Sequence, residues 1–282
     1  MKKTIGLYDI DSKIPNLALM KLSAWHKKQG DQTELYFPLK EYDKVYASQI
    51  FEWSRPAYHY DKIGGSGTGK WGVVLKKEIE HIYPDYDLYK IDYAMGFTTR
   101  GCIRKCPFCI VNKKEGLIQE WAEVSEFWNG QKELMLLDNN ILASPSWKKS
   151  FNFIIKNKII LIEHGMDIRL INEENANFIK QIKFKGYIHF AFDNIGTEKQ
   201  VRKGISILKK AGIRPYKLIF YVLIGFESTP EDDLYRVELL RSLGAKPFIM
   251  KFDKDNRYQM DFARWVNHKA IFNSVKWEDY KK

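Results

Sequence analysis

Short apolar runs alternate along this chain with stretches of helical periodicity. The clearest helix is predicted for residues 228–244, where Thr229 is suited to cap the N-terminus and Pro230 to occupy the first turn. Apolar runs at 216–226 and 246–252 flank this helix. Runs this short, bounded by polar residues, are typical of buried parallel strands. The pattern therefore predicts βα units, in which each strand is followed by a helix.

The same alternation extends over residues 86–250. Strands are predicted at 90–101, 133–140, 166–172, 187–194, 216–226 and 246–252. Helices are predicted at 117–130, 145–165, 173–183, 198–212 and 228–244. Right-handed crossovers between parallel strands would curl such a series into a closed or partial barrel. Residues 251–282 lack the alternation, and their aromatic residues at helical spacing predict a helical tail.

Residues 1–85 show a smaller α/β pattern. A strand is predicted at 4–10, and an amphipathic helix follows at 16–30, where Gly30 ends the pattern. Further strands are predicted at 33–39 and 44–51, and a last one runs into a glycine-rich loop within 59–72. These elements predict a small α/β domain in front of the βα series.

The glycine-rich loop comes close to a nucleotide-binding motif. Residues Gly64 to Lys70 read GGSGTGK, which satisfies most of the phosphate-binding P-loop pattern. That pattern requires Ser or Thr next, to hold magnesium, but Trp71 follows here. We therefore expect a tight turn between a strand and a helix, and no nucleotide site.

Composition limits the function further. The formal net charge is 46 − 35 = +11, which favours anionic partners such as nucleic acid, although many of the lysines lie next to acids and are explained by solvated helix faces. No apolar stretch approaches the length of a membrane span, and the first residues lack a signal-peptide pattern. Clustered cysteines argue against a secreted disulfide scaffold, so we expect a cytoplasmic protein.

The only three cysteines of the chain are Cys102, Cys106 and Cys109, at C-x3-C-x2-C spacing. Three soft thiolates so close together suit one metal centre. A [4Fe–4S] cluster has four irons, so three cysteines leave one iron open to another ligand. A structural zinc site normally has four protein ligands, and a fourth is not evident.

The cysteine pattern, with the aromatic Phe108 before the last cysteine, follows a predicted strand in YAMGFTTRGCIRKCPFCIV. In this it resembles the cluster loop of the radical S-adenosylmethionine (SAM) enzymes. The resemblance implies a partial (β/α)6 barrel over residues 86–250, a [4Fe–4S] cluster, and SAM chelated by the open iron. It also implies flavodoxin or ferredoxin as electron donor, and a 5′-deoxyadenosyl radical that abstracts hydrogen from a substrate that the sequence does not identify.

Active groups of a parallel barrel gather at the carboxyl ends of its strands. Asp138, Asn139 and Asn140 follow the second predicted strand. In the resemblance this position matches the family's Gly-Gly-Glu-type segment, which binds the SAM amino group. The sequence departs by having Asp-Asn-Asn, but a carboxylate and amides accept the same hydrogen bonds. A turn rich in Asp and Asn is the competing interpretation.

Three further strand-end residues are candidate SAM contacts. Arg169 either pairs with the SAM carboxylate or substrate, or forms an ion pair with Asp167 on the same strand face. Asp193 either holds a ribose hydroxyl or caps the segment that starts near Gly196. Gly225 permits close backbone approach to a flat ligand, and the resemblance implies adenine there.

The order of elements in residues 1–85 resembles a shortened cobalamin-binding-type Rossmann-like domain. That family's Asp-x-His-x-x-Gly motif is missing here, so we expect a degenerate domain that has lost cobalamin. Three alternatives stay open at this point. The alternatives to the radical SAM hypothesis above are a cobalamin-dependent radical SAM methyltransferase, a basic nucleic-acid-binding protein with a structural metal at the cysteines, and a simple electron carrier.

Overall fold

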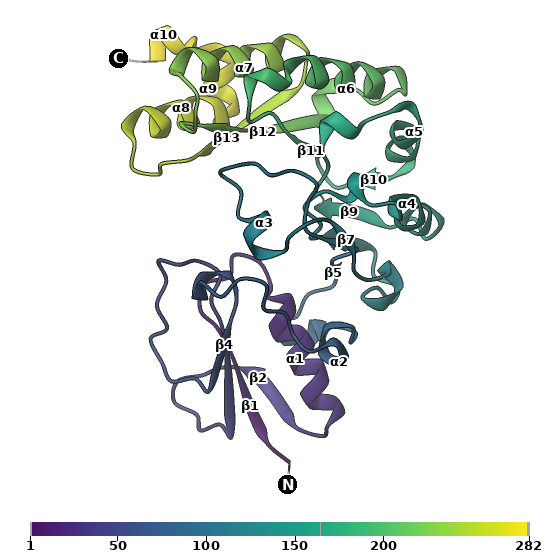
Figure 1. Cartoon of the computed structure of the whole chain (residues 1–282), viewed down its shortest axis with the longest axis vertical. Helices are drawn as coiled ribbons and strands as arrows, with labels where there is room; N and C mark the ends of the chain where they lie inside the picture. Colours follow the sequence, from purple (N-terminus) through teal and green to yellow (C-terminus); the bar gives the residue numbers. More distant parts are fainter. Residues whose placement is uncertain (1, 164, 281–282) are drawn as a thin grey trace. The chain divides into compact units, whose positions relative to one another are not determined.

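The computed structural model describes residues 2–163 and 165–280 (Figure 1). Contacts divide the chain into two compact units, Met1–Asn139 and Asn140–Lys282. The predicted mixed α/β class is confirmed, because the strand pairs among the described residues are parallel except for one short antiparallel hairpin. The described strands do not close into a barrel. The division into domains 1–85, 86–250 and 251–282 stays a prediction.

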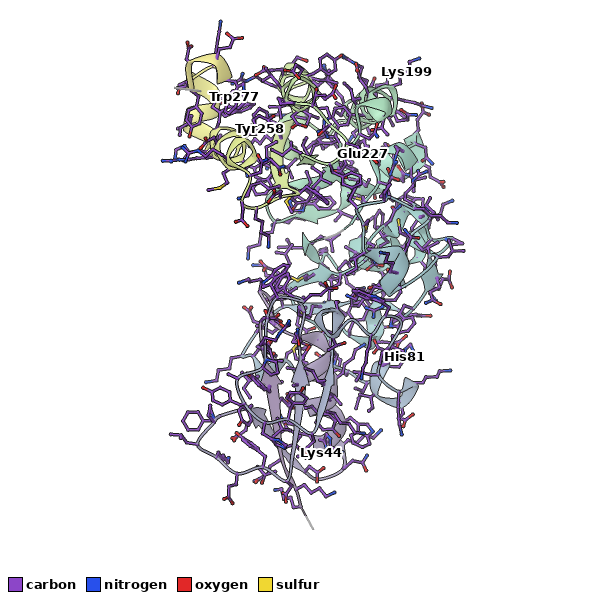
Figure 2. All side chains as sticks on the ribbon, turned by 60° about the vertical axis from the view of Figure 1, so that its left-hand side comes forward. Lys44, His81, Lys199, Glu227, Tyr258 and Trp277 are labelled. Carbon is purple, nitrogen blue, oxygen red and sulfur yellow. The ribbon has the colours of Figure 1, made fainter. Side chains whose placement is uncertain are left out.

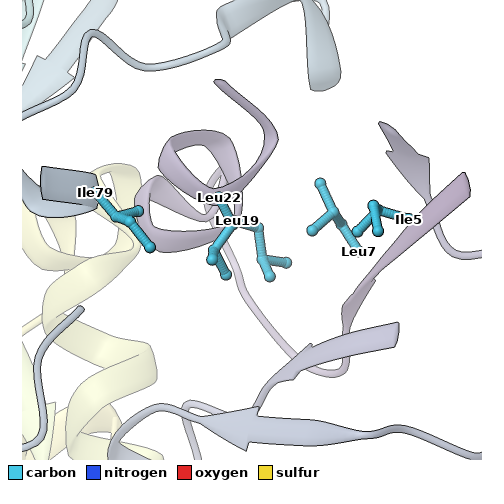
Figure 3. Packing of buried hydrophobic residues seen from close by; sticks show 5 residues of the cluster. All are labelled: Ile5, Leu7, Leu19, Leu22 and Ile79. Carbon is cyan, nitrogen blue, oxygen red and sulfur yellow. The ribbon is translucent and has the colours of Figure 1, made fainter. Parts of the chain in front are cut away.

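The first unit begins with a parallel sheet in the order β2-β1-β3-β4. Its elements are β1 (Thr4–Asp9), α1 (Leu17–Lys28), β2 (Gln32–Leu35), β3 (Lys44–Ser48) and β4 (Lys62–Gly64). Asn16 caps α1 by accepting a hydrogen bond from the Leu19 amide. Alternate residues of β1, Ile5 and Leu7, point to one face of the sheet and pack against Leu19 and other apolar residues of the α1 side (Figure 3). The small α/β domain predicted for this region is thus present as helix on sheet.

The glycine-rich stretch forms a tight turn, as predicted. β4 passes into η1 (Ser66–Thr68), and the next α-helix, α2 (Lys77–Glu80), starts well beyond it. A Cβ atom on Gly65 would lie 2.2 Å from the Gln49 carbonyl oxygen, and Gly65 has a φ of 101°. The glycine therefore allows the turn to pack closely on the chain after β3.

The rest of the first unit holds the cysteine segment. Its elements are η2 (Tyr86–Leu88), β5 (Ala94–Gly96), β6 (Thr99–Arg100), α3 (Val111–Lys114), β7 (Gln119–Glu120), η3 (Val124–Glu126) and β8 (Glu133–Leu136). β5 pairs with β8 in parallel, and β6 pairs with β7 in an antiparallel hairpin. The helix predicted for residues 117–130 is wrong. Hairpin pairing occupies its first part, and the Phe127 ring packs directly against Gly96.

The second unit contains most of the predicted βα series. Its elements are η4 (Ile141–Ala143), α4 (Trp147–Lys156), β9 (Ile160–Glu163), η5 (Ile168–Leu170), α5 (Glu173–Gln181), β10 (Lys183–Phe184), β11 (Ile188–Ala191), η6 (Ile195–Thr197), α6 (Glu198–Lys210), η7 (Pro215–Lys217), β12 (Leu218–Ile224), α7 (Pro230–Ser242) and β13 (Lys246–Lys251). β9 pairs with β10, and β11, β12 and β13 form a parallel sheet. α7 begins with the predicted cap Thr229, which forms a capping box with Asp232.

Two predictions for this unit are wrong in the same region. The helix predicted at 145–165 ends at Lys156, because Lys158 adopts a φ of 53° and the β-branched run that follows forms β9. The strand predicted at 166–172 is instead the short 3-10 helix η5. There the Asp167 carboxylate accepts a hydrogen bond from the Arg169 backbone amide. Such a local hydrogen bond stabilises a turn in place of an extended strand.

The tail is helical, as predicted, with α8 (Arg257–Asn267), α9 (Lys269–Ser274) and α10 (Trp277–Tyr280). Its aromatic residues pack on one another. Tyr258 and Trp277, both labelled in Figure 2, have ring centroids 6.1 Å apart, and the rings of Phe262 and Trp277 are 4.9 Å apart. Within the described residues, no helix is long and apolar enough to cross a membrane.

A buried ion pair joins helices α1 and α2 of the first unit. Lys21 of α1 lies 2.8 Å from Glu80 of α2, and both residues are less than a tenth exposed. The Trp121 indole N–H donates to the same Glu80 oxygen at 3.1 Å. Burial lowers the pKa of Lys21, and the Glu80 charge opposes this shift.

We expect Glu80→Gln to destabilise the protein by about 3 kcal/mol, because it leaves the Lys21 ammonium buried without a counter-charge. Adding Lys21→Met should recover a large part of this loss. Urea unfolding followed by tryptophan fluorescence measures both effects. Glu78→Gln is the matched control, since Glu78 is exposed on the same helix. A loss no larger than that of the control would show that the pair is dispensable.

Candidate metal centre

The segment that leads into the cysteines is anchored by a buried carboxylate. Asp138, which follows β8, accepts four hydrogen bonds of 2.5 to 3.1 Å from the backbone amides and hydroxyl groups of Thr98 and Thr99. Burial raises the pKa of the Asp138 carboxyl, and the four donors oppose that rise. These bonds tie the chain entering the cysteine loop to the end of β8.

The base of the cysteine loop is closed by backbone bonds and by a second carboxylate. The Cys102 amide donates to the Gly116 carbonyl at 3.2 Å, just beyond the β6–β7 hairpin. Glu115 accepts a hydrogen bond from the Gly101 amide at 2.9 Å. Gly101 has a φ of 78°, and a Cβ atom there would lie 2.2 Å from the Leu117 carbonyl oxygen. Only glycine fits this position without rearrangement.

The three cysteines are half-buried thiols on this closed loop. The Arg104 amide donates to the Cys102 sulfur at 3.4 Å, and the Cys109 amide donates to the Cys106 carbonyl at 3.0 Å. An N–H group directed at sulfur stabilises the thiolate form that binds metal. Phe108 is also half-buried, between exposed Pro107 and the last cysteine.

A [4Fe–4S] cluster at the three cysteines stays a prediction. Among the described residues, no three His, Cys, Asp or Glu side chains lie close enough to hold one metal ion. A cubane cluster takes one thiolate at each of three iron corners, so its sulfur ligands lie farther apart than those around one zinc. The loop offers three soft donors, and three thiolates on such a cluster would leave one iron open.

The structure places the residues predicted after the second strand at different points. Asp138 directs its oxygens toward Thr98 and Thr99, and its Oδ1 accepts three of the four hydrogen bonds. The Asn139 side chain donates to Glu115 at 2.8 Å. Asn140, at the start of the second unit, is buried and precedes η4. A role of these three residues in binding SAM stays a prediction.

In the second unit, Arg169 lies 2.7 Å from Asp167. The predicted ion pair of these residues is therefore present. The expected shared strand face is wrong, because both residues belong to the turn around η5. The Asp167 carboxylate contacts the Arg169 side chain and amide together.

Asp193 and Gly225 lie at the carboxyl ends of β11 and β12. Asp193 accepts a hydrogen bond from the Leu223 amide at 3.0 Å. Burial raises the pKa of the Asp193 carboxyl, while this hydrogen bond and the Arg236 charge act to lower it. The cap predicted for this region belongs to Asn194, which accepts the Gly196 amide. Gly225 has a φ of 80° and no room for a side chain beside Gln259.

Sequence reasoning missed the ion pair beneath these strand ends. Arg236 and Asp233 of α7 are completely buried and 2.6 Å apart. Arg236 also donates to the Phe192 and Leu223 carbonyls, both at 2.9 Å, and so fixes the ends of β11 and β12. The i,i+3 spacing of the two charges was a visible signal. The burial of the two charges could not be recognised from the sequence, because the same spacing is common on exposed helix faces.

No protein-family model matches this chain, and no curated protein is similar enough to count as a relative.

We expect Asp138→Asn to destabilise the protein by about 1–3 kcal/mol, because the amide NH2 group would face a threonine amide that then has no acceptor. Denaturant unfolding of the metal-free protein measures this loss. Asp92→Asn is the matched control, since Asp92 is exposed in the same unit. Equal stabilities of the two variants would contradict the anchoring role of Asp138.

Proposed function

We propose that this protein is a radical SAM enzyme built on a partial (β/α)6 barrel. The observation that carries the proposal is the cysteine loop. All three cysteines of the chain occur at C-x3-C-x2-C spacing, on a loop closed at its base just beyond a strand of a parallel pair. The parallel βα units of the second unit support the barrel part of the proposal.

A [4Fe–4S] cluster held by this loop would supply the reductive cleavage of SAM to methionine and a 5′-deoxyadenosyl radical, which would take a hydrogen atom from the substrate. The electron comes from a reduced carrier such as flavodoxin or ferredoxin. The chain contributes ligands, position and exclusion of water. Cys102, Cys106 and Cys109 would each supply a thiolate to one iron of the cluster, and the half-buried ring of Phe108 would help to exclude water there. The cations Arg104 and Lys105 offset the negative charge of the thiolates.

SAM itself is proposed to contact residues at the strand ends. The Asp193 carboxylate accepts a hydrogen bond from a ribose hydroxyl, and the Leu223 amide holds that carboxylate in place. Gly225 offers its backbone groups to adenine on the side away from Gln259, whose side chain fills the space that a Cβ atom of residue 225 would take. Arg169 pairs with the SAM carboxylate, in exchange for part of its contact with Asp167. Asn139 and Asn140 are the amides available to the SAM amino group, with Asp138 holding the loop beneath.

We expect the wild-type protein, reconstituted anaerobically with iron and sulfide, to bind about four irons per chain and to form 5′-deoxyadenosine from SAM when reduced with dithionite. Cys106→Ala should lose this activity, because one iron loses its thiolate. Ile103→Ala is the matched control, since Ile103 is an exposed side chain of the same loop.

Each other outcome of this reconstitution points elsewhere. Binding of zinc at one equivalent, without iron or sulfide, would replace the proposal with a nucleic-acid-binding protein that has a structural metal. Iron binding without SAM cleavage would favour an electron carrier. A cobalamin spectrum after reconstitution would indicate the methyltransferase, and we expect none.

We expect Asp193→Asn to weaken SAM binding about tenfold, because a hydrogen bond to a charged acceptor becomes one to a neutral acceptor. Equilibrium dialysis with labelled SAM and the reconstituted protein measures this change. Asp255→Asn, at an exposed position of the same unit, should bind like the wild type. Unchanged affinity of the Asp193 variant would remove Asp193 from the SAM site.

A further inference from the structure

One buried charge beside the cysteines has no part in the function proposed above. The Glu115 side chain is only 6% exposed, although it lies directly after the short surface helix α3. A carboxylate at such a position is costly unless several donors surround it. The contacts of Glu115 therefore show what its burial achieves.

The two oxygens of the Glu115 carboxylate have different tasks. Oε2 accepts both donors, the Gly101 amide at 2.9 Å and the Asn139 side-chain amide at 2.8 Å. Oε1 lies 3.9 Å from the Arg100 guanidinium and 3.8 Å from the Lys114 ammonium. Oε2 thus binds the backbone and a side-chain amide, and Oε1 lies near two positive charges.

The chain segments that Oε2 joins are the ones that determine where the cysteines lie. Gly101 immediately precedes Cys102, and Glu115 itself is at the other end of the loop. Asn139 follows Asp138, which anchors Thr98 and Thr99. Glu115 therefore closes the cysteine loop and fastens the closed loop to the end of β8.

We propose that Glu115 is a positioning residue that pre-organises the three cysteine thiols for cluster binding and sets the charge at the base of their loop. The inference rests on the proposed function for the identity of the cluster. A flexible loop would lose conformational entropy on binding, and a loop already closed loses less. Without Glu115, the Arg100 and Lys114 charges would also lack their buried counter-charge.

The test uses the fact that the chain has no cysteines outside the loop. The reaction of 5,5′-dithiobis(2-nitrobenzoate) with the metal-free, full-length protein therefore takes place at the loop thiols alone, and its rate rises as these half-buried cysteines become more exposed. We expect Glu115→Ala to raise the rate at least about tenfold, because it removes a charged acceptor from two donors. Glu115→Gln should stay within about threefold of the wild type, since its amide oxygen still accepts at the Oε2 position.

Matched variants separate this role from a general loss of stability. Glu120→Ala and Glu120→Gln make the same chemical changes at an exposed position of β7 and should leave the rate unchanged. Asn139→Ala removes one donor only and should give a rate between those of wild type and Glu115→Ala. A Glu115→Ala rate equal to the wild-type rate, or a Glu115→Gln rate equal to that of Glu115→Ala, would overturn the proposal.

The charge part of the proposal has its own readout. In the reconstituted protein, Glu115→Gln should shift the cluster's reduction potential to more positive values, because the Arg100 and Lys114 charges then stabilise the reduced cluster. Glu120→Gln should shift it far less, because solvent screens an exposed charge. Equal shifts for the two variants would contradict a special role of the buried charge.

Failure of the proposed function is distinguishable from failure of this inference. If the wild-type protein binds no iron and sulfide, the radical SAM proposal is wrong, yet the thiol rates of the metal-free variants still decide whether Glu115 closes the loop. If the wild type binds the cluster and cleaves SAM while the thiol rates do not differ, only the role of Glu115 is wrong.

Discussion

Buried or half-buried carboxylates that accept backbone N–H groups hold the loops of this protein at the ends of its strands. Asp138 accepts the amides of Thr98 and Thr99, and Asp193 accepts that of Leu223. In the first sheet, Asp11 likewise accepts the amides that follow β3, at 2.7 and 2.9 Å. A carboxylate removed from water needs such donors to offset its lost hydration. Each one therefore fixes the conformation of the loop that supplies them.

This constraint changes how the polar strand ends should be interpreted. Residues at these positions are candidates for ligand contacts because the carboxyl ends of parallel strands converge. In this chain some of them are already used internally. The Asp138 carboxylate accepts hydrogen bonds from the threonines, and the Asn139 side chain donates one to Glu115. The thiols of the cysteine loop are therefore supported by polar residues that need not touch a ligand themselves.

The accuracy of the sequence predictions depends on how much of each element is determined locally. α7 was predicted well, because Thr229 and Asp232 cap it through contacts within four residues. β9 was missed, since Ile160–Glu163 follows α4 with only a short turn between, and its apolar run also suits a helix. Residues 117–130 have helical spacing, but pairing of β7 with β6 outweighs it.

The sequence by itself determined the parallel α/β class, the Thr229 cap of α7 and the C-x3-C-x2-C spacing, because these depend on residues close together in the chain. Only the tertiary structure decided which charges are buried and what they face. Glu115 and Asp138 look like ordinary surface acids in the sequence, yet both are withdrawn from solvent around the cysteine loop. Arg236 is likewise buried completely on α7. Burial depends on segments distant in sequence, and no local pattern encodes it.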